Sequence, residues 1–206
     1  MKKILKRLIF INFLIKIKSF YSWQNSAFSS PSPHFIKQAV LLRNAICDSL
    51  WVETGTFLGD TTDVLARNAN KVYTIEPAEE FYLLAINRFK NIHNVEVIKG
   101  TSEEVFPLLL PTISGNINFW LDGHFSAGAT YHGENDTPVL VELANIEKYF
   151  SNFDRFVIFI DDVRCFNSSN PSFSQYPPLN TLVEWANKHN LIWTIEHDIL
   201  IIKNFN

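Results

Sequence analysis

Residues 52–59, Val-Glu-Thr-Gly-Thr-Phe-Leu-Gly, place an acid directly before a turn that contains two glycines. Gly55 and Gly59 let the backbone approach a ligand closely, because glycine has no Cβ and tolerates positive φ. Glu76 ends the next apolar run, about twenty residues further on, where an acid can accept hydrogen bonds from ribose hydroxyls. This spacing predicts a ligand that contains adenosine.

The residues within the turn discriminate between adenosine ligands. A dinucleotide turn has the pattern G-x-G-x-x-G, whereas the bulky Phe57 stands two residues after Gly55. The negative charge of Glu53, just before the turn, disfavours a pyrophosphate and favours an ammonium group. S-adenosylmethionine has an amino group and a sulfonium centre and no phosphate, so the pattern favours it over NAD. The sequence contains no G-x-x-x-x-G-K-[ST], which excludes a P-loop.

A second group of acids follows two later apolar runs. Asp122 ends one run, and Asp161 and Asp162 end the next. If the two runs are neighbouring strands, these three carboxylates converge beside the ligand pocket. A divalent cation such as Mg²⁺ takes oxygen ligands and lowers the pKa of a hydroxyl that it binds. The alternatives are a helix cap for Asp122 and a solvated surface pair for Asp161 and Asp162.

The elements that position these residues alternate between strand and helix. This alternation predicts βαβ units, and the near-continuous apolar runs predict parallel strands buried on both faces. Two further runs around a turn at 196–198 predict a hairpin that adds an antiparallel strand. The predicted fold is α/β, a Rossmann-like, doubly wound, mostly parallel sheet with a C-terminal antiparallel hairpin strand. Strands are expected over 50–55, 71–77, 94–100, 116–123 and 154–163, and helices over 33–47, 59–70, 78–91, 101–110, 136–150 and 177–190.

Length and composition predict one domain with an extension. The chain has 206 residues, 47% of them hydrophobic, which suits one domain with a sizeable core. We assign residues 1–33 to a basic, apolar extension and linker, and residues 34–206 to the domain. The apolar centre of the extension, residues 8–15, is too short to span a membrane. We rank a loosely attached extension first, a membrane-surface helix second and a cleaved signal third.

Charge and cysteine content bound the partners and the compartment. The net charge of −3 gives the chain no basic face typical of duplex binders, so we expect no nucleic-acid partner. The two cysteines, Cys47 and Cys165, lie far apart and indicate reduced thiols. We expect a cytoplasmic protein, with weak membrane association through residues 1–20 as an option. The sequence does not determine the oligomeric state.

Glu53-x-Gly55-x-Phe57-x-Gly59 resembles motif I of the class I S-adenosylmethionine-dependent methyltransferases, normally [D/E]-x-G-x-G-x-G. Phe57 replaces the middle glycine of the motif. Glu76 matches the acid that closes the second strand in that family, and the segment 99–104 matches its adenine-contacting loop. The resemblance covers roughly residues 35–203 and implies cofactor contacts from Glu53, Gly55, Thr56, Gly59, Glu76, Thr101, Ser102 and Asp122.

The second group of acids is similar to that of metal-dependent O-methyltransferases, including macrocin O-methyltransferase-like enzymes that act on sugar hydroxyls. Asp122, Asp161 and Asp162 match their metal positions. The resemblance implies Mg²⁺-assisted O-methylation of a small-molecule or sugar hydroxyl, with Asp122 and His124 as catalytic residues. His124 stands one residue earlier than the family's histidine base, and His132 is a second candidate.

Two other functions compete with this one. The first is an NAD-dependent oxidoreductase, which Glu53 and Phe57 disfavour. The second is a non-catalytic partner protein that keeps the fold. A nucleic-acid methyltransferase is disfavoured, because the Asn/Asp-Pro-Pro-Tyr pattern of amino-methylating enzymes is replaced by Asp-Gly-His-Phe at 122–125.

Overall fold

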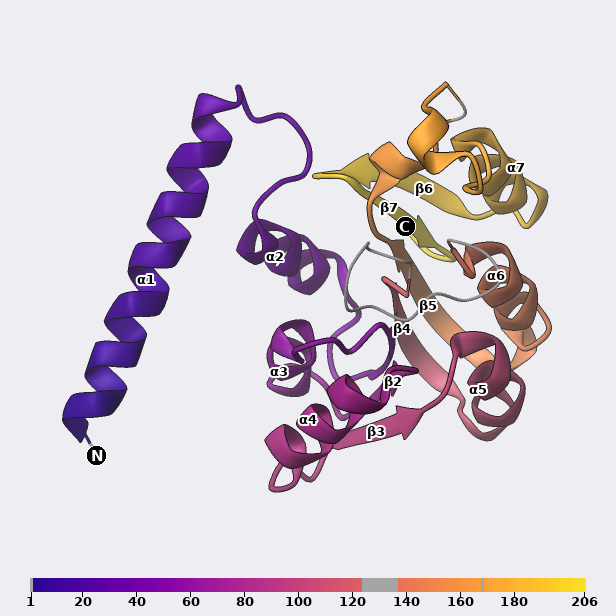
Figure 1. The fold of residues 1–206 in the computed structure, drawn as a ribbon. Helices are drawn as coiled ribbons and strands as arrows, with labels where there is room; N and C mark the ends of the chain where they lie inside the picture. Colours follow the sequence, from indigo (N-terminus) through magenta and orange to yellow (C-terminus); the bar gives the residue numbers. More distant parts are fainter. Residues whose placement is uncertain (1, 124–136, 168) are drawn as a thin grey trace.

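The computed structural model describes residues 2–123, 137–167 and 169–206 (Figure 1). Its centre is a seven-stranded sheet with the order β3-β2-β1-β4-β5-β7-β6. Only β7 runs against the other strands, pairing antiparallel with both β5 and β6. The predicted fold class is therefore confirmed. The strands are β1 (Leu50–Thr54), β2 (Lys71–Glu76), β3 (Val95–Lys99), β4 (Gly115–Leu121), β5 (Phe153–Ile160), β6 (Ile192–Glu196) and β7 (Ile199–Lys203).

Helices cover both faces of the sheet, with α2, α3 and α4 on one side and α5, α6 and α7 on the other (Figure 1). Neighbouring residues of a strand point to opposite faces, so Trp51 and Val52 of β1 belong to two separate cores. This explains why the strands are apolar throughout. The helices are α2 (His34–Asn44), α3 (Asp60–Ala66), α4 (Glu79–Phe89), α5 (Ser102–Leu109), α6 (Val139–Glu147) and α7 (Leu179–Lys188), with 3-10 turns η1 (Leu110–Thr112), η2 (Phe150–Asn152), η3 (Val163–Cys165) and η4 (Pro171–Phe173).

The hairpin at the end of the chain turns where the sequence predicts it. His197 and Asp198 connect β6 to β7, with φ of 48° and 70°. Two positive φ values at the centre of a two-residue turn match the right-handed twist of the flanking strands. The hairpin places β7 directly against β5, at the edge where Asp161 and Asp162 emerge.

A long helix, α1 (Lys2–Asn25), precedes the domain and lies to one side of it (Figure 1). Its last turn contacts the β6–β7 turn, where the rings of Trp23 and His197 lie 5.6 Å apart. The Ser32 hydroxyl also donates to the His197 carbonyl, at 3.2 Å. Among the residues that the structure describes, no helix is long and apolar enough to cross a membrane. Membrane association through residues 1–20 stays a prediction, as does the cytoplasmic location.

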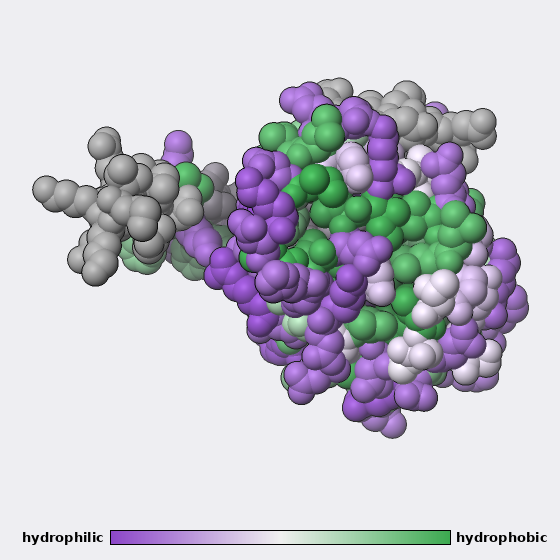
Figure 2. All heavy atoms as spheres, turned by 90° about the horizontal axis from the view of Figure 1, so that it is seen from below, coloured by the Kyte–Doolittle hydropathy of each residue, from purple (hydrophilic) through white to green (hydrophobic). Residues whose placement is uncertain are grey.

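The surface of the domain mixes polar and apolar areas. Figure 2 shows one face, on which a continuous hydrophobic area is bordered by hydrophilic residues. Exposed apolar side chains occur on several helices, among them Leu83, Leu84 and Ile86 of α4. Hydrophobic residues of this chain therefore lie on the surface as well as in the two cores.

Candidate functional site

The turn after β1 packs directly against the end of β4. Gly55 has a φ of 85°, and a Cβ at this position would lie 2.6 Å from the carbonyl oxygen of Asp122. The Asp122 amide in turn donates to the Thr54 carbonyl, at 3.2 Å. Two features therefore require glycine at position 55: its backbone is left-handed, and a Cβ would collide with the Asp122 carbonyl. The close approach that Gly55 allows in this structure is to the backbone of Asp122, and the predicted close approach to a ligand stays a prediction.

Phe57 has a backbone conformation that glycine adopts more readily than other residues. Its φ is 47°, in the left-handed region that disfavours side chains other than glycine. The Phe57 ring packs on Phe81 of α4, with ring centroids 4.6 Å apart. Gly59, with a φ of 77°, is the N-cap residue directly before α3. The turn thus has positive φ at all three motif positions, although only two of them are glycine.

Glu76 lies at the carboxyl end of β2, 5% exposed, with its carboxylate directed at the turn. Its Oε2 accepts from the Phe57 amide at 2.8 Å, and its Oε1 accepts from the Ala78 amide at 2.9 Å. Burial raises the pKa of Glu76, and the two hydrogen bonds oppose this shift. Each carboxylate oxygen has a second lone pair, so Glu76 is held in place and can still accept hydrogen bonds from a ligand.

Glu53 and Thr56 belong to a buried polar network beneath the turn. Glu53 is 1% exposed, and its Oε2 accepts from Thr62 at 2.5 Å and from Thr74 at 2.7 Å. The hydroxyls of Thr56 and Thr74 lie 2.6 Å apart. Glu53 Oε1 is buried without a hydrogen-bond partner in the described part of the chain. This placement favours support of the turn over the direct ligand contact predicted for Glu53 and Thr56.

The loop after β3 reaches the same edge of the sheet. The Gly100 amide donates to the Glu76 carbonyl, at 3.2 Å. Thr101 caps α5 in a capping box with Glu104, and Ser102 opens the helix with 5% exposure. The helix cap accounts for both residues as structural elements. Their contact with a ligand base stays a prediction.

Asp161 and Asp162 do emerge beside Asp122, because the Asp161 amide donates to the Leu121 carbonyl at the end of β4. Their charge is balanced by Lys37 of α2, whose Nζ lies 2.5 Å from Asp161 Oδ1 and 2.7 Å from Asp162 Oδ1. Burial by itself lowers the pKa of Lys37, but the two carboxylates more than reverse this and raise it. Burial raises the pKa of Asp161, and Lys37 opposes that shift.

These contacts argue against the predicted metal site of Asp122, Asp161 and Asp162, which no finding supports. Within the described residues, no group of three or more His, Cys, Asp or Glu side chains is placed to hold a metal ion. The physical reason is that an ammonium group already compensates the two neighbouring carboxylates. The site residues therefore do not fit a bound Mg²⁺.

A second cation ties this pair to the C-terminal hairpin. The Arg164 guanidinium contacts both oxygens of Asp162, with NH2 3.0 Å from Oδ2, and also pairs with Asp198. Asp198 Oδ1 accepts from the Arg164 amide, at 2.9 Å. Asp162 itself has a φ of 57°. The result is a network of three carboxylates and two cations that joins α2, η3 and the β6–β7 turn.

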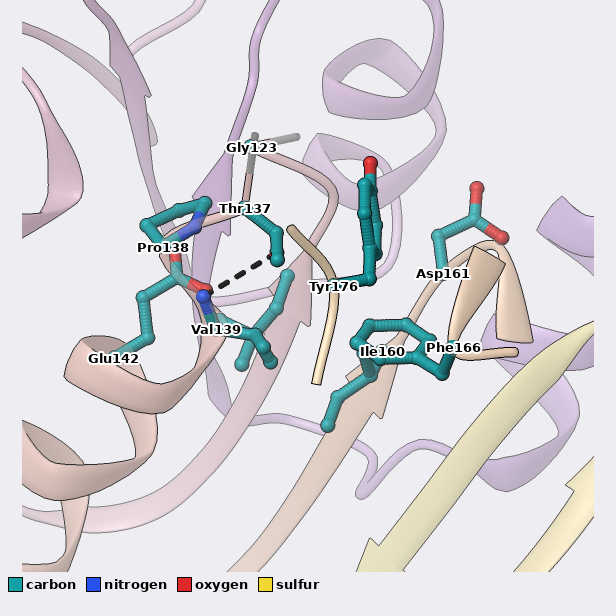
Figure 3. A pocket seen from close by; sticks show the side chains of 10 residues that line it. Gly123, Thr137, Pro138, Val139, Glu142, Ile160, Asp161, Phe166 and Tyr176 are labelled. Carbon is teal, nitrogen blue, oxygen red and sulfur yellow. Dashed lines mark hydrogen bonds between the residues drawn. The ribbon is translucent and has the colours of Figure 1, made fainter. Parts of the chain in front are cut away.

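A cavity lies next to these acids, between the ends of β4 and β5 and the start of α6. Figure 3 shows the Tyr176 hydroxyl and the Asp161 carboxylate pointing toward the same side of the view, with Ile160 and Phe166 below them. The cavity has a volume of about 10 Å³, the space of about one water molecule, with an apolar floor and a polar rim. The lining residues include Gly123, Thr137, Glu142, Asp161, Phe166 and Tyr176.

The sequence prediction of a base falls on His124, with His132 as second candidate, and both lie outside the described residues. The structure adds a residue that the sequence analysis missed, Lys37. Val40 and Leu41, one helical turn further on, are buried in the core, and Lys37 is buried with them. A lone lysine on the apolar stripe of α2 was the signal that could have identified it.

Comparisons with known proteins give fold-level matches. No family model matches the sequence, and no curated protein matches it. Among solved structures, a putative methyltransferase from Streptococcus mutans in complex with SAH is 14% identical, with a TM-score of 0.52 over 83% of this chain and 96% of that chain. The N-methyltransferase NodS from Bradyrhizobium japonicum is 16% identical, with a TM-score of 0.53 over 81% and 92%.

A third match corrects the expectation about nucleic acid. A dimethyladenosine transferase from Plasmodium falciparum is 15% identical, with a TM-score of 0.51 over 84% of this chain and 61% of that chain. The prediction that nucleic acid is excluded as a partner was therefore wrong, because a protein named as a dimethyladenosine transferase shares the fold. The chain has the class I methyltransferase fold, and these likenesses extend no further than that fold.

Proposed function

From this shared fold and the geometry of the turn after β1, we propose that the chain is an S-adenosylmethionine-dependent methyltransferase. The observation that carries the proposal is the placement of Glu76. Its carboxylate is fixed at the end of β2 by the amide of Phe57, a residue of the motif I turn. When bound, S-adenosylmethionine supplies an electrophilic methyl group on its sulfonium sulfur.

The residues at this edge fit the cofactor in type and position. Glu76 accepts hydrogen bonds from the ribose hydroxyls through its remaining lone pairs. The left-handed backbone at Gly55, Phe57 and Gly59 shapes the turn on which the methionine end rests. Glu53 lies buried beneath that turn, and because burial raises its pKa to about 7 it places negative charge there once the pH exceeds this value. An ammonium group is favoured above such a turn and a pyrophosphate is disfavoured.

For the acceptor we propose a small molecule with a nucleophilic hydroxyl, such as a sugar, of which only the hydroxyl would enter the cavity. Asp161 lines the cavity beside β4 and β5, with one oxygen held by Lys37 and by the Asp162 amide. Its Oδ2 is left to accept a hydrogen bond from a hydroxyl in the cavity. Burial raises the pKa of Asp161, which suits a group that takes up the hydroxyl proton during transfer. His124 stays a predicted base.

Calorimetric titration with S-adenosylhomocysteine tests the cofactor assignment. We expect binding by the wild-type protein and a loss of at least about tenfold in affinity for Glu76→Ala, because two hydrogen bonds to ribose disappear. Glu80→Ala is the matched control, since Glu80 is an exposed acid on the adjacent helix α4. Its affinity should equal that of the wild type.

Transfer is then measured with isotopically labelled S-adenosylmethionine and a panel of sugar and catechol acceptors. Asp161→Asn should bind S-adenosylhomocysteine normally and transfer the methyl group more slowly. The absence of S-adenosylhomocysteine binding by folded wild-type protein would refute the proposed function, and would bring forward an NAD-dependent or non-catalytic role.

A further inference from the structure

We propose that Lys37 is the resident cation of the Asp161–Asp162 pair, occupying the position in which a divalent metal would bind and closing the pair to metal ions. The inference rests on the proposed function only where it gives the Asp161–Asp162 pair a role in methyl transfer. The arrangement of charges itself is independent of any bound cofactor.

The Lys37 ammonium group lies between the two carboxylates. Its Nζ is 2.5 Å from Asp161 Oδ1 and 2.7 Å from Asp162 Oδ1, so it bridges the two carboxylates. The three side chains are 8%, 8% and 12% exposed. A metal ion would have to displace a buried ammonium group, and that group would then lack its counter-charges.

Other donors complete the coordination of the pair. Asp161 Oδ1 also accepts from the Asp162 amide, at 2.7 Å. Asp162 Oδ1 and Oδ2 both contact the Arg164 guanidinium. Asp161 Oδ1 and Asp162 Oδ1 thus each accept from two donors, and Asp162 Oδ2 accepts from the Arg164 guanidinium. Mg²⁺ is usually bound through one or two carboxylates and keeps several waters, so at this pair it would compete with the cations that already hold these oxygens.

The backbone of Lys37 cannot move away easily. Lys37 lies in the first turn of α2, where its amide donates to the Pro33 carbonyl at 3.2 Å. Just before this turn, Ser32 bonds to the His197 carbonyl of the hairpin, and just after it Val40 is buried in the core. The backbone of Lys37 is therefore fixed both before and after this residue, and this limits how far its ammonium group can move.

Lys37 determines how the Asp161 carboxylate is oriented at the site. Lys37 fixes one oxygen of Asp161, which leaves the other for the cavity. An ammonium group balances charge without accepting a substrate oxygen into its coordination sphere. In our assignment Lys37 is a positioning residue that acts through Asp161, and methyl transfer proceeds without a divalent metal at this pair.

Manganese binding tests this assignment, measured by electron paramagnetic resonance of free Mn²⁺ and by calorimetry. The wild-type protein should show no saturable Mn²⁺ binding up to about millimolar concentration, the weak end of oxygen-ligand cation sites. Lys37→Met removes the ammonium group and should create a Mn²⁺ site, which the added change Asp161→Asn should abolish. Lys90→Met, at an exposed lysine, is the control and should bind no more Mn²⁺ than the wild type.

Two results would overturn the assignment. One is saturable Mn²⁺ binding by the wild type that Asp161→Asn abolishes. The other is a folded Lys37→Met protein that binds no Mn²⁺. If Lys37→Met fails to fold, Lys37→Gln replaces it, and if both fail the wild-type titration decides alone. S-adenosylhomocysteine titrated into the same samples separates the two questions, because its failure to bind would refute the proposed function and leave the Mn²⁺ result standing.

Discussion

The carbonyl oxygen of Asp122 lies so close to Gly55 that a Cβ on Gly55 would be 2.6 Å from it. This contact joins the carboxyl ends of β1 and β4, which carry the predicted cofactor turn and the edge of the acceptor cavity. A single methyl group therefore forces the two ends apart.

We expect Gly55→Ala to destabilise the protein and to weaken S-adenosylhomocysteine binding. The control is Gly115→Ala, because Gly115 has a similar φ of 89° but the nearest atom, Asp154 Oδ2, would be 4.0 Å from a Cβ. Left-handed strain alone costs about 1–2 kcal/mol, which is the loss expected for Gly115→Ala in urea unfolding. Gly55→Ala should cost more. Equal losses in the two variants would show that the contact with Asp122 is unimportant.

Phe57 offers a test of the left-handed motif position. The Phe57→Gly protein should be more stable to unfolding than the Phe57→Ala protein by about 1 kcal/mol, because alanine retains the strain of positive φ. Both variants lose the Phe57–Phe81 ring contact, so that loss cancels in the comparison. Urea unfolding of Phe57→Gly and Phe57→Ala measures the difference. A more stable alanine variant would contradict the assigned backbone conformation.

Glu53 should make stability fall as the pH rises from about 4.5 to about 7. Burial raises the pKa of Glu53 from its ordinary 4.5 to about 7, so between these values the folded chain holds a proton that the unfolded chain has released. Stability falls with pH wherever the folded state binds more protons. A shift of this size corresponds to at most about 3 kcal/mol.

The comparison with Glu53→Gln isolates this contribution, because glutamine has nearly the same shape and does not titrate. We expect the difference in unfolding free energy between wild type and Glu53→Gln to change in favour of the variant as the pH is raised from 4.5 to 8. A difference that does not depend on pH would mean that Glu53 is not buried as described.

Lys37→Met should destabilise the protein by about 3–5 kcal/mol at neutral pH, the usual cost of breaking a buried ion pair. Arg43→Met is the comparison, because Arg43 pairs with Glu196 at the surface and such pairs contribute about 0–1 kcal/mol. Thermal or urea unfolding measures both. If Lys37→Met lowers the unfolding free energy as little as Arg43→Met does, the ion pairs of Lys37 with Asp161 and Asp162 are exposed to solvent.

The alternation of apolar runs and helical patterns was enough to predict the sheet, its doubly wound class and the C-terminal hairpin. These features depend on periodicity within short segments, which a sequence displays directly. The turn at Gly55 and Gly59 and the acid at Glu76 could also be located, because a strand, a tight turn and a helix lie in immediate succession. The hairpin at His197 and Asp198 could be placed but not its positive φ values, since neither residue is glycine.

The pairing of distant charges was decided only by the tertiary structure. Asp161 and Asp162 suggested a metal because the sequence shows acids together and does not show what faces them. Lys37 is 124 residues from Asp161, and its ammonium group reaches the acids only because α2 packs beside the end of β5. The sequence by itself therefore determined the elements and the place of the site at the strand ends. The fold decided which charge compensates which, because electrostatic partners are set by distance in space and not by spacing along the chain.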